Sequence, residues 1–421
     1  MHKVSLHYCG GLCFHDSSTQ KGDDVFMYVP VIPRKSSELF MFAVALVLIL
    51  FSITIQFSWF PVVTSDYTYF VAKWFSMLQS SSGLTAFAEP FSDYAPLYLY
   101  ILKFLTFVPV DSLTSIKAVS LIADGASAFC IIFIARNSSP RRFSGAQLAV
   151  IFVIFLCIPT IALNGSLWGQ TDILYALPTI ATFYFLLRYQ PILASTLFGI
   201  ALSVKVQAIF FAPVFIGYML QRKSTRGFIV IPFIVFVLSV IPVIFGGGDF
   251  WYWLFIYAKE AGEYPYLSVS APSVFAFASN AALSTSLQNL LFWAGIGTAA
   301  LCASIVCYIV ATDREKTAEK LALLSLISVL IIPYVLPRMH ERYFFLADIF
   351  SFMYALFNPS EWYIAGMVIL ASTLSYMPFL SSQVAFLSFA HIDLRIPALF
   401  LFAALCILFL KLIRLNTENS T

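Results

Sequence analysis

Charged residues are scarce in this chain: 11% of its 421 residues are Asp, Glu, Lys or Arg, whereas 60% are hydrophobic. Soluble globular domains usually have about a quarter charged residues, so this composition excludes that class and indicates a polytopic membrane protein. The formal net charge of +3 comes from small basic groups between apolar runs rather than from one basic patch. We therefore expect no nucleic-acid partner.

Motifs of soluble nucleotide chemistry are also missing. The sequence has no Walker loop, dinucleotide fingerprint, HExxH or GxSxG motif in a usable context. It has no ligand set with recognised metal-binding spacing, so we predict no cofactor, although two nearby carboxylates leave room for a divalent metal. An enzyme of this composition has to take an activated substrate that is already in the membrane.

Long apolar segments are what the sequence has in abundance. The segment 96–110 is too short to cross a bilayer and contains Lys103, so we predict that it lies in the membrane interface. The other segments then give an all-α fold with about twelve transmembrane helices. They are expected near 39–62, 116–135, 147–164, 172–187, 190–205, 207–220, 228–245, 287–311, 321–336, 343–357, 361–380 and 396–413.

The distribution of basic residues orients these helices. With this topology most basic side chains between the spans face the cytoplasm and both termini lie inside. We predict a polar cytoplasmic tail at 1–38, one transmembrane catalytic domain at 39–414 with an external loop at 63–115, and a cytoplasmic tail at 415–421. The first apolar run follows a polar stretch and should act as an uncleaved anchor.

Two Asp-Tyr pairs open the two halves of the external loop: Asp66-Tyr67 and Asp93-Tyr94. Each is followed by a helical pattern too short or too polar to span, which predicts two interfacial helices. Either aspartate can serve as a helix N-cap. Their matching positions at the mouth of a membrane bundle favour a functional pair instead.

The external segment LPRMHERYF places Arg338, His340, Glu341 and Arg342 within five residues. Guanidinium and imidazolium groups at a membrane surface suit a phosphate, which arginine binds through paired donors. An ion-pair network that ties helix ends together is the alternative.

Two ionisable residues are predicted inside the bundle. Lys205 lies between two short apolar runs without a polar loop, which indicates a partly buried cation and a functional candidate. Asp124 lies within a predicted span and can pair with a cation such as Lys205 or Lys117.

The motif NGSLWGQTD supplies Trp168, Gln170 and Asp172 at a turn. Gly165 and Gly169 permit a close backbone approach there. This pattern indicates a small sugar or phosphate contact surface, with a plain helical hairpin as the alternative.

Taken in order, SDYTYFVAKWF, FSDYAPLYLY, NGSLWGQTD and LPRMHERYFF resemble motifs of the GT-C superfamily of integral-membrane glycosyltransferases. The chain is most similar to the branch of dolichyl-phosphate-glucose-dependent glucosyltransferases and their prokaryotic relatives, over residues 40–360. The resemblance implies a first external loop with two surface helices, a lipid-phosphate-linked sugar donor and an inverting transfer on the extracytoplasmic side. It places the catalytic acidic residue of the family on Asp66.

The other motifs match with substitutions. The second Asp-Tyr motif of the family falls on Asp93-Tyr94, where this chain has Ala95-Pro96 in place of two prolines. The His-Glu-Lys-like motif falls on residues 340–342, with arginine in place of lysine. These differences leave the sugar and the acceptor undetermined.

The resulting hypothesis is a hexosyltransferase that moves a glucosyl or mannosyl unit from a polyprenyl-phosphate donor to a glycan or glycolipid acceptor. Asp66 would act as general base and Asp93 would position the acceptor or the surface helices. Arg338, His340 and Arg342, with Lys205 as a further candidate, would stabilise the leaving phosphate.

Two other functions compete with this hypothesis. A multi-spanning transporter or lipid flippase would use Asp124 and Lys205 along a path, and a non-catalytic assembly subunit would use the external motifs for contacts. The short loops favour a bacterial or archaeal inner membrane, with the endoplasmic reticulum as the site in a eukaryote.

Overall fold

The computed structural model describes residues 34–139, 141–260, 266–278, 283–313, 317–388 and 392–418. Regular structure in this part is nearly all helical, which confirms the expected all-α class. The predicted N-terminal tail lies mostly outside the described residues. The α-helices are α1 (Arg34–Ser58), α2 (Ala72–Ser80), α3 (Pro96–Leu105), α4 (Ser112–Ser138), α5 (Gly145–Leu156), α6 (Pro159–Ala162), α7 (Asp172–Leu187), α8 (Pro191–Val204), α9 (Ala212–Leu220), α10 (Ile231–Val240), α11 (Pro242–Phe245), α12 (Phe250–Leu254), α13 (Ile256–Glu260), α14 (Thr285–Thr312), α15 (Ala318–Val335), α16 (Phe345–Phe357), α17 (Trp362–Gln383) and α18 (Arg395–Glu418).

Four shorter helical segments matter for the site. Two are wider π-type turns, and two are tighter 3-10 turns that lead into longer helices. They are η1 (Tyr67–Val71), η3 (Leu163–Trp168), η4 (Val206–Phe211) and η7 (Glu341–Phe344).

By length and composition, seven helices of the described part can cross a membrane. They include α1, α4, α14, α15, α17 and α18 and the segment Arg226–Phe245. An eighth span results if Gly145–Leu156 and Pro159–Trp168 count as one, although the chain bends by 56° between them. The chain is therefore a multi-pass membrane protein, while the count of about twelve spans stays a prediction.

The predicted span at 147–164 is not one continuous helix, because α5 ends at Leu156 and a new helical segment begins at Pro159; whether it crosses the bilayer stays a prediction. Proline lacks a backbone N–H and disfavours the helical conformation of the residue before it. Ile158 accordingly has an extended ψ of 121°. The bend sends η3 back toward the end of α1.

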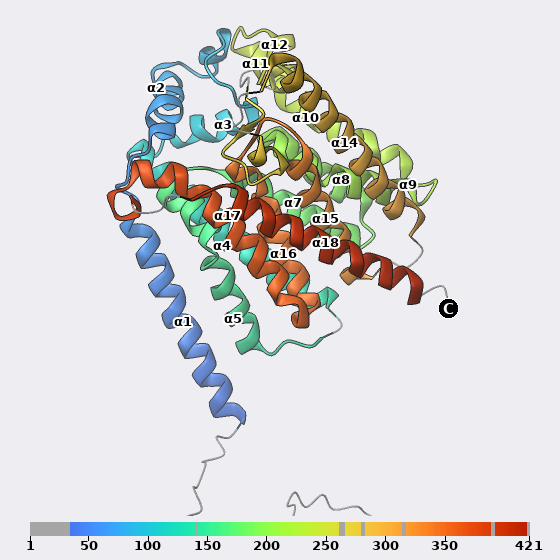
Figure 1. Ribbon diagram of the computed structural model, residues 1–421. Coiled ribbons are helices and arrows are strands. Elements are labelled where there is room, and N and C mark those ends of the chain that lie inside the picture. The colour runs from blue at the N-terminus through green and yellow to red at the C-terminus, as the bar shows by residue number, and fades with distance from the viewer. Residues whose placement is uncertain are drawn as a thin grey trace, which may run out of the picture.

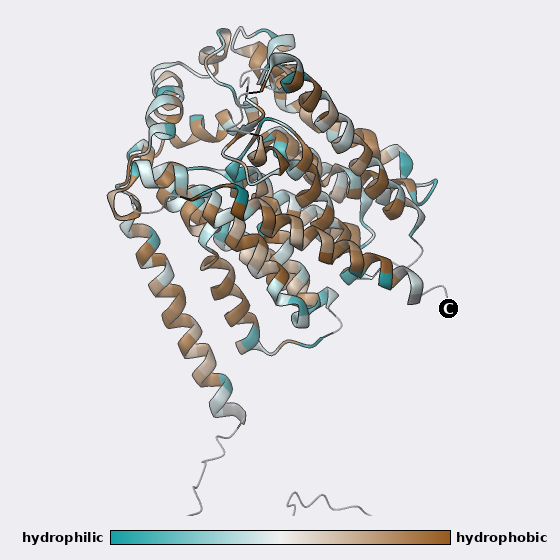
Figure 2. Ribbon diagram, in the orientation of Figure 1, coloured by the Kyte–Doolittle hydropathy of each residue, from teal (hydrophilic) through white to brown (hydrophobic). Residues whose placement is uncertain are grey.

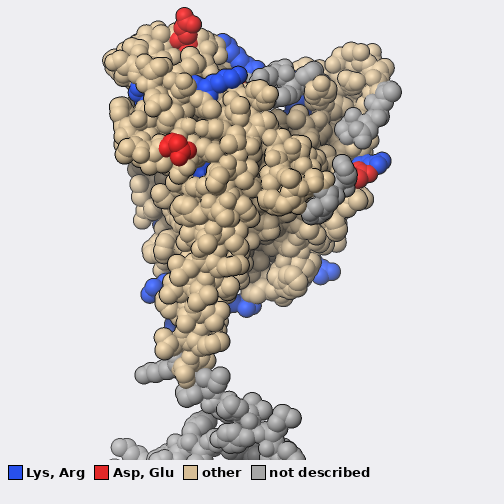
Figure 3. Space-filling model, turned by 90° about the vertical axis from the view of Figure 1, so that its left-hand side faces the viewer, with Lys and Arg blue, Asp and Glu red and all other residues tan. Residues whose placement is uncertain are grey.

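Figures 1 and 2 show how the helices are arranged. The blue α1 and the green α5 lie side by side at one edge, α10 and α14 lie at the other, and the outer surfaces are largely brown, that is, hydrophobic. Figure 3 shows a broad uncharged band that separates charged side chains near the two ends of one face. This distribution suits a surface in contact with lipid.

The main core lies around α15. Of its residues, 78% are buried, and α15 packs against α9, α14, α16 and α18. A helix that is apolar on all sides is expected at the centre of a bundle. Facing side chains of α7, α8 and α16 complete the same core. The site described below lies where the N-terminal ends of α7 and η7 meet the first loop.

Two helices form in the predicted external loop, as the sequence indicates. Trp74, Phe75 and Leu78 of α2 pack with Leu99 and Leu102 of α3 in a second core. The ammonium of Lys103 donates to the carbonyls of Leu78, at 2.6 Å, and Ser81, at 2.7 Å, and so joins α3 to the end of α2. With 10 residues, α3 is too short to span a bilayer; its interfacial position stays a prediction.

A small parallel pairing was not expected from the sequence. Strand β1 (Ser268–Val269) pairs with β2 (Met339–His340), so the segment predicted as an external loop is partly a strand. Arg338 has a φ of 63° and its N–H donates to the carbonyl of Leu267 at 2.9 Å. This left-handed residue turns the chain from α15 into β2.

Candidate active site

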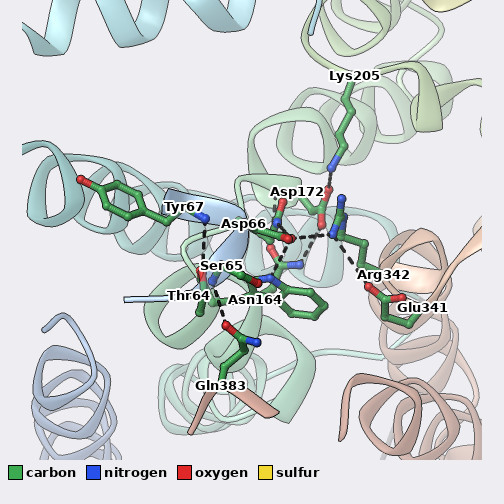
Figure 4. A network of polar contacts seen from close by, with 12 residues as sticks. Thr64, Ser65, Asp66, Tyr67, Asn164, Asp172, Lys205, Glu341, Arg342 and Gln383 are labelled. Atoms are coloured by element: carbon green, nitrogen blue, oxygen red, sulfur yellow. Dashed lines mark hydrogen bonds and ion pairs between the residues drawn. The ribbon is translucent and has the colours of Figure 1, made fainter. Parts of the chain in front are cut away.

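Asp66 lies at the centre of a polar network (Figure 4). Its Oδ2 accepts hydrogen bonds from Trp168 Nε1 at 3.0 Å, Gln170 Nε2 at 2.8 Å and Arg342 Nη1 at 3.2 Å. Its Oδ1 accepts none from the part of the chain that the structure describes. Asp66 precedes η1 but makes no side-chain cap bond, so the N-cap interpretation of this residue is wrong.

The backbone on both sides of Asp66 is held in place. Thr64 Oγ1 donates to the carbonyl of Trp168 at 2.8 Å, and the N–H of Ser65 donates to Gln383 Oε1 at 2.8 Å.

The fully buried Lys117 of α4 donates to carbonyls of Trp59, Val62 and Leu167, at 3.0, 2.7 and 3.1 Å respectively. These bonds join the end of α1, the start of the first loop and η3.

The predicted glycine turn is confirmed in η3 and the residue after it. Gly169 is left-handed, with a φ of 82°, and a Cβ on Gly165 would lie 2.9 Å from Ser120 Cβ. The short approach lets η3 lie against α4 and directs the indole of Trp168 toward Asp66. The same indole stacks on Phe379 with ring centroids 4.3 Å apart, which fixes its plane.

Lys205 is a buried cation, as the sequence indicates, with 5% of its surface exposed. Its ammonium is hydrogen-bonded and ion-paired to Asp172 Oδ1, while Asp172 Oδ2 accepts a bond of 2.7 Å from Asn164. The ammonium also lies 5.3 Å from the ring centroid of Tyr94, in a cation–π geometry.

The suggested pairing of Asp124 with a lysine is wrong. Lys205 pairs with Asp172, and Lys117 donates to backbone carbonyls. Asp124 Oδ2 is buried without a hydrogen-bond partner among the described residues.

The segment 338–342 brings its charges to the same place. Besides its bond to Asp66, Arg342 lies 3.8 Å from Glu341 Oε1, and its Cζ is 5.6 Å from the indole centroid of Trp168. The guanidinium of Arg338 lies over the ring of Phe292 at 4.3 Å. The ion-pair network considered as an alternative for this segment is therefore real, and it includes the proposed catalytic carboxylate.

Burial changes the protonation of this segment. It raises the pKa of Glu341 to about 7, against the opposing effect of Arg342. Burial, with the charges of Arg342 and Lys205, lowers the pKa of His340 well below its ordinary value. His340 is thus a neutral imidazole at neutral pH rather than the imidazolium expected from the sequence.

Asp93 is half-buried and caps no helix, because the residue before α3 is Ala95, which has no capping side chain. The cap interpretation is therefore wrong for this aspartate as well. Burial raises the pKa of its carboxyl group.

These residues surround one cavity of about 710 Å³, a size typical of small-molecule sites. Ten of the eleven predicted site residues line it, and Asp172 lies behind the wall, paired with Lys205. The predicted lining residues are Asp66, Asp93, Tyr94, Trp168, Gln170, Lys205, Arg338, His340, Glu341 and Arg342.

Sequence reasoning missed several parts of the wall. Tyr98, Gln207, Tyr257, Phe292 and Ser382 also line the cavity. Gln207 lies two residues after a predicted site residue and could have been found by this spacing. Tyr98 lies four residues after Tyr94 and could have been found in the same way, whereas the other three come from distant elements that only the tertiary fold brings together. In the part of the chain that the structure describes, no group of three or more His, Cys, Asp or Glu residues could hold a metal ion.

A comparison with protein families matches residues 91–333 to the model of glycosyltransferase family 87. The chain belongs to glycosyltransferase family 87. This family is of the GT-C type, so the resemblance noted in the sequence is confirmed, and the protein is a membrane glycosyltransferase. No curated protein matches the chain significantly.

The family 87 match includes the second Asp-Tyr pair, the NGSLWGQTD turn and Lys205. Asp66 precedes the matched region and Arg342 follows it. The structure nevertheless joins both residues to Trp168 and Gln170, which lie inside the match. The network therefore links the family region to both flanking segments.

Proposed function

We propose that this family 87 glycosyltransferase moves a hexose, with inversion, from a polyprenyl-phosphate-linked donor to a lipid-linked glycan or other envelope acceptor. One observation carries the proposal. Asp66 is a cavity carboxylate whose Oδ2 is held by three donors, while Oδ1 has no partner among the described residues. A fixed carboxylate with one open oxygen is what a general base requires.

In the proposed reaction the acceptor hydroxyl oxygen attacks the anomeric carbon of the donor. Its proton passes to Asp66 Oδ1 as the new glycosidic bond forms. The bond between the anomeric carbon and the phosphate oxygen breaks, and its electron pair leaves with the polyprenyl phosphate. Attack opposite the leaving group inverts the anomeric configuration.

The leaving phosphate is stabilised by the cationic side of the cavity. Arg338 and Arg342 provide positive charge, and the neutral imidazole of His340 can donate an N–H to a phosphate oxygen. Lys205 also contributes positive potential, although its ion pair with Asp172 reduces this contribution. We assign Asp93 and Tyr94, at the cavity wall, to the acceptor.

The site is assigned to the extracytoplasmic side of a prokaryotic inner membrane. The positive-inside rule supports the extracytoplasmic side, because it predicts that the loop 63–115 lies outside. The short loops of the chain favour a prokaryotic membrane. The donor lipid then reaches the cavity from the outer leaflet of the bilayer.

Purified protein in liposomes tests the reaction. With polyprenyl-phospho-mannose or polyprenyl-phospho-glucose and a lipid-linked glycan mixture, we expect release of polyprenyl phosphate and a glycan longer by one hexose. Movement of the labelled lipid between leaflets without its consumption would instead identify a flippase.

A further inference from the structure

One polar side chain of the cavity wall has no part in the reaction described above. Gln207, in η4, lines the cavity and is 5% exposed. Its Oε1 is buried and accepts no hydrogen bond within the described residues, and no bond of its amide nitrogen is found there. A buried acceptor without a donor costs stability and is uncommon in folded proteins, so it calls for a partner.

The other glutamines around Asp66 are occupied. Gln170 donates to Asp66 at 2.8 Å, and Gln383 accepts from the backbone of Ser65 at 2.8 Å. The ammonium of Lys205, two residues before Gln207, is committed to Asp172. Protein groups therefore explain these side chains but not the amide of Gln207.

The backbone around Gln207 is rigidly held. The N–H of Lys205 donates to the carbonyl of Ala201 at 3.1 Å, and the N–H of Ala208 donates to the carbonyl of Lys205 at 3.3 Å. Ser328 of α15 donates to the carbonyl of Phe210 at 2.7 Å. The backbone that carries the amide is therefore held at the wall, as recognition of a fixed ligand group requires.

The chemistry of an amide selects the ligand group. Oε1 needs a donor, and an ionised phosphate has only acceptors, so the phosphate of the donor lipid does not satisfy it. A half-turn of the terminal amide brings Oε1 to the cavity side, where a sugar hydroxyl can donate to it and can also accept from the amide nitrogen. We propose that Gln207 hydrogen-bonds a hydroxyl of the hexose being transferred and so selects the donor sugar. This inference rests on the proposed function.

Deoxy donors test the inference. Wild type and Gln207→Leu are compared with polyprenyl-phospho-hexose, using the parent sugar that wild type transfers and its 2-, 3-, 4- and 6-deoxy forms. Wild type should transfer one deoxy form more slowly than the parent, by on the order of tenfold or more, and Gln207→Leu should lose that one preference while keeping the others. A site built to bond a hydroxyl discriminates against the analogue that lacks it.

A matched control is Gln221→Leu, since Gln221 Oε1 is likewise buried without a partner but lies outside the cavity. It should keep the wild-type preferences. Gln207→Met, of similar volume, replaces Gln207→Leu if the latter does not fold. If wild type and both Gln207 variants show the same preferences among the deoxy donors, this inference is overturned but the proposed function is not. If wild type transfers no parent hexose, both the proposed function and this inference are overturned.

Discussion

At the scale of single residues, the site depends on how one carboxylate is held. All three side-chain donors to Asp66 use the same oxygen, so the other oxygen is left for a substrate proton. Two of these donors come from the turn after α6, and the third comes from a segment 276 residues away in the sequence. Removing one donor should therefore leave the carboxylate less precisely positioned without dismantling the cavity.

Trp168→Phe removes one hydrogen bond to Asp66 but preserves the aromatic ring that stacks on Phe379. Without this bond the carboxylate is held less precisely toward the acceptor hydroxyl, which should lower the transfer rate by on the order of tenfold. The measurement is kcat for hexose transfer by purified protein. Trp362→Phe, at an exposed tryptophan, should leave kcat unchanged; equal rates for wild type and Trp168→Phe would show that this bond does not support the base.

Glu341 makes stability depend on pH. Its pKa is raised by burial to about 7 in the folded protein, above the value of an exposed glutamate, so the unfolded chain loses its proton first as the pH rises. The free energy of unfolding of wild type should therefore fall as the pH rises from about 5 to about 8. Glu341→Gln should lack this loss, so over the same range its free energy of unfolding should rise by on the order of 3 kcal/mol relative to wild type.

Thermal unfolding in detergent, followed at several pH values, measures this difference. Glu89→Gln, at an exposed glutamate, is the matched control. A difference between Glu341→Gln and wild type that does not change with pH would contradict the raised pKa of this buried carboxyl group.

At the scale of elements, the bend between α5 and α6 and the short π-type segment η3 bring the turn 163–172 to Asp66. The glycines of NGSLWGQTD predict a close approach, and the structure confirms it at Gly165. Neither the bend angle nor the partner helix follows from the motif, because both depend on where α4 packs.

Gly165→Ala should separate η3 from α4, since the new Cβ would lie 2.9 Å from Ser120 Cβ. Overpacking of this kind costs about 1–3 kcal/mol. We expect a lower unfolding temperature and slower transfer. Gly125→Ala, in α4 with no atom within 4 Å of the added carbon, should keep both at the wild-type level or above; an equal effect of the two substitutions would contradict the packing of η3.

At the scale of the whole molecule, composition alone predicts the membrane class and the helical fold, and the family match and the structure support both. The polar motifs between the predicted spans also predict most of the cavity, because LPRMHERYF and the Asp-Tyr pairs gather polar groups in an otherwise apolar chain. The pairing of Lys205 with Asp172 rather than Asp124 could not be predicted, since a single sequence does not show which faces of the helices pack against each other. The strand at Met339–His340 could not be predicted either, because two residues are too few to show the alternating hydrophobic pattern of a strand.

Topology can be tested with single cysteines in a variant without the native ones. Ser82 and Lys223 are exposed and lie in the predicted outer and inner loops. Ser82→Cys should react with a membrane-impermeant maleimide in intact cells, and Lys223→Cys only after permeabilisation. The reverse pattern would place the cavity on the cytoplasmic side.

Asp66→Asn tests the central claim most directly. The amide keeps the shape of the side chain but cannot take the acceptor proton, so kcat for transfer from polyprenyl-phospho-hexose should fall by about 10²–10⁴ while donor binding persists. Asp111→Asn, which alters the exposed cap of α4, should transfer at the wild-type rate. Normal transfer by Asp66→Asn would contradict the assignment of Asp66 as the base.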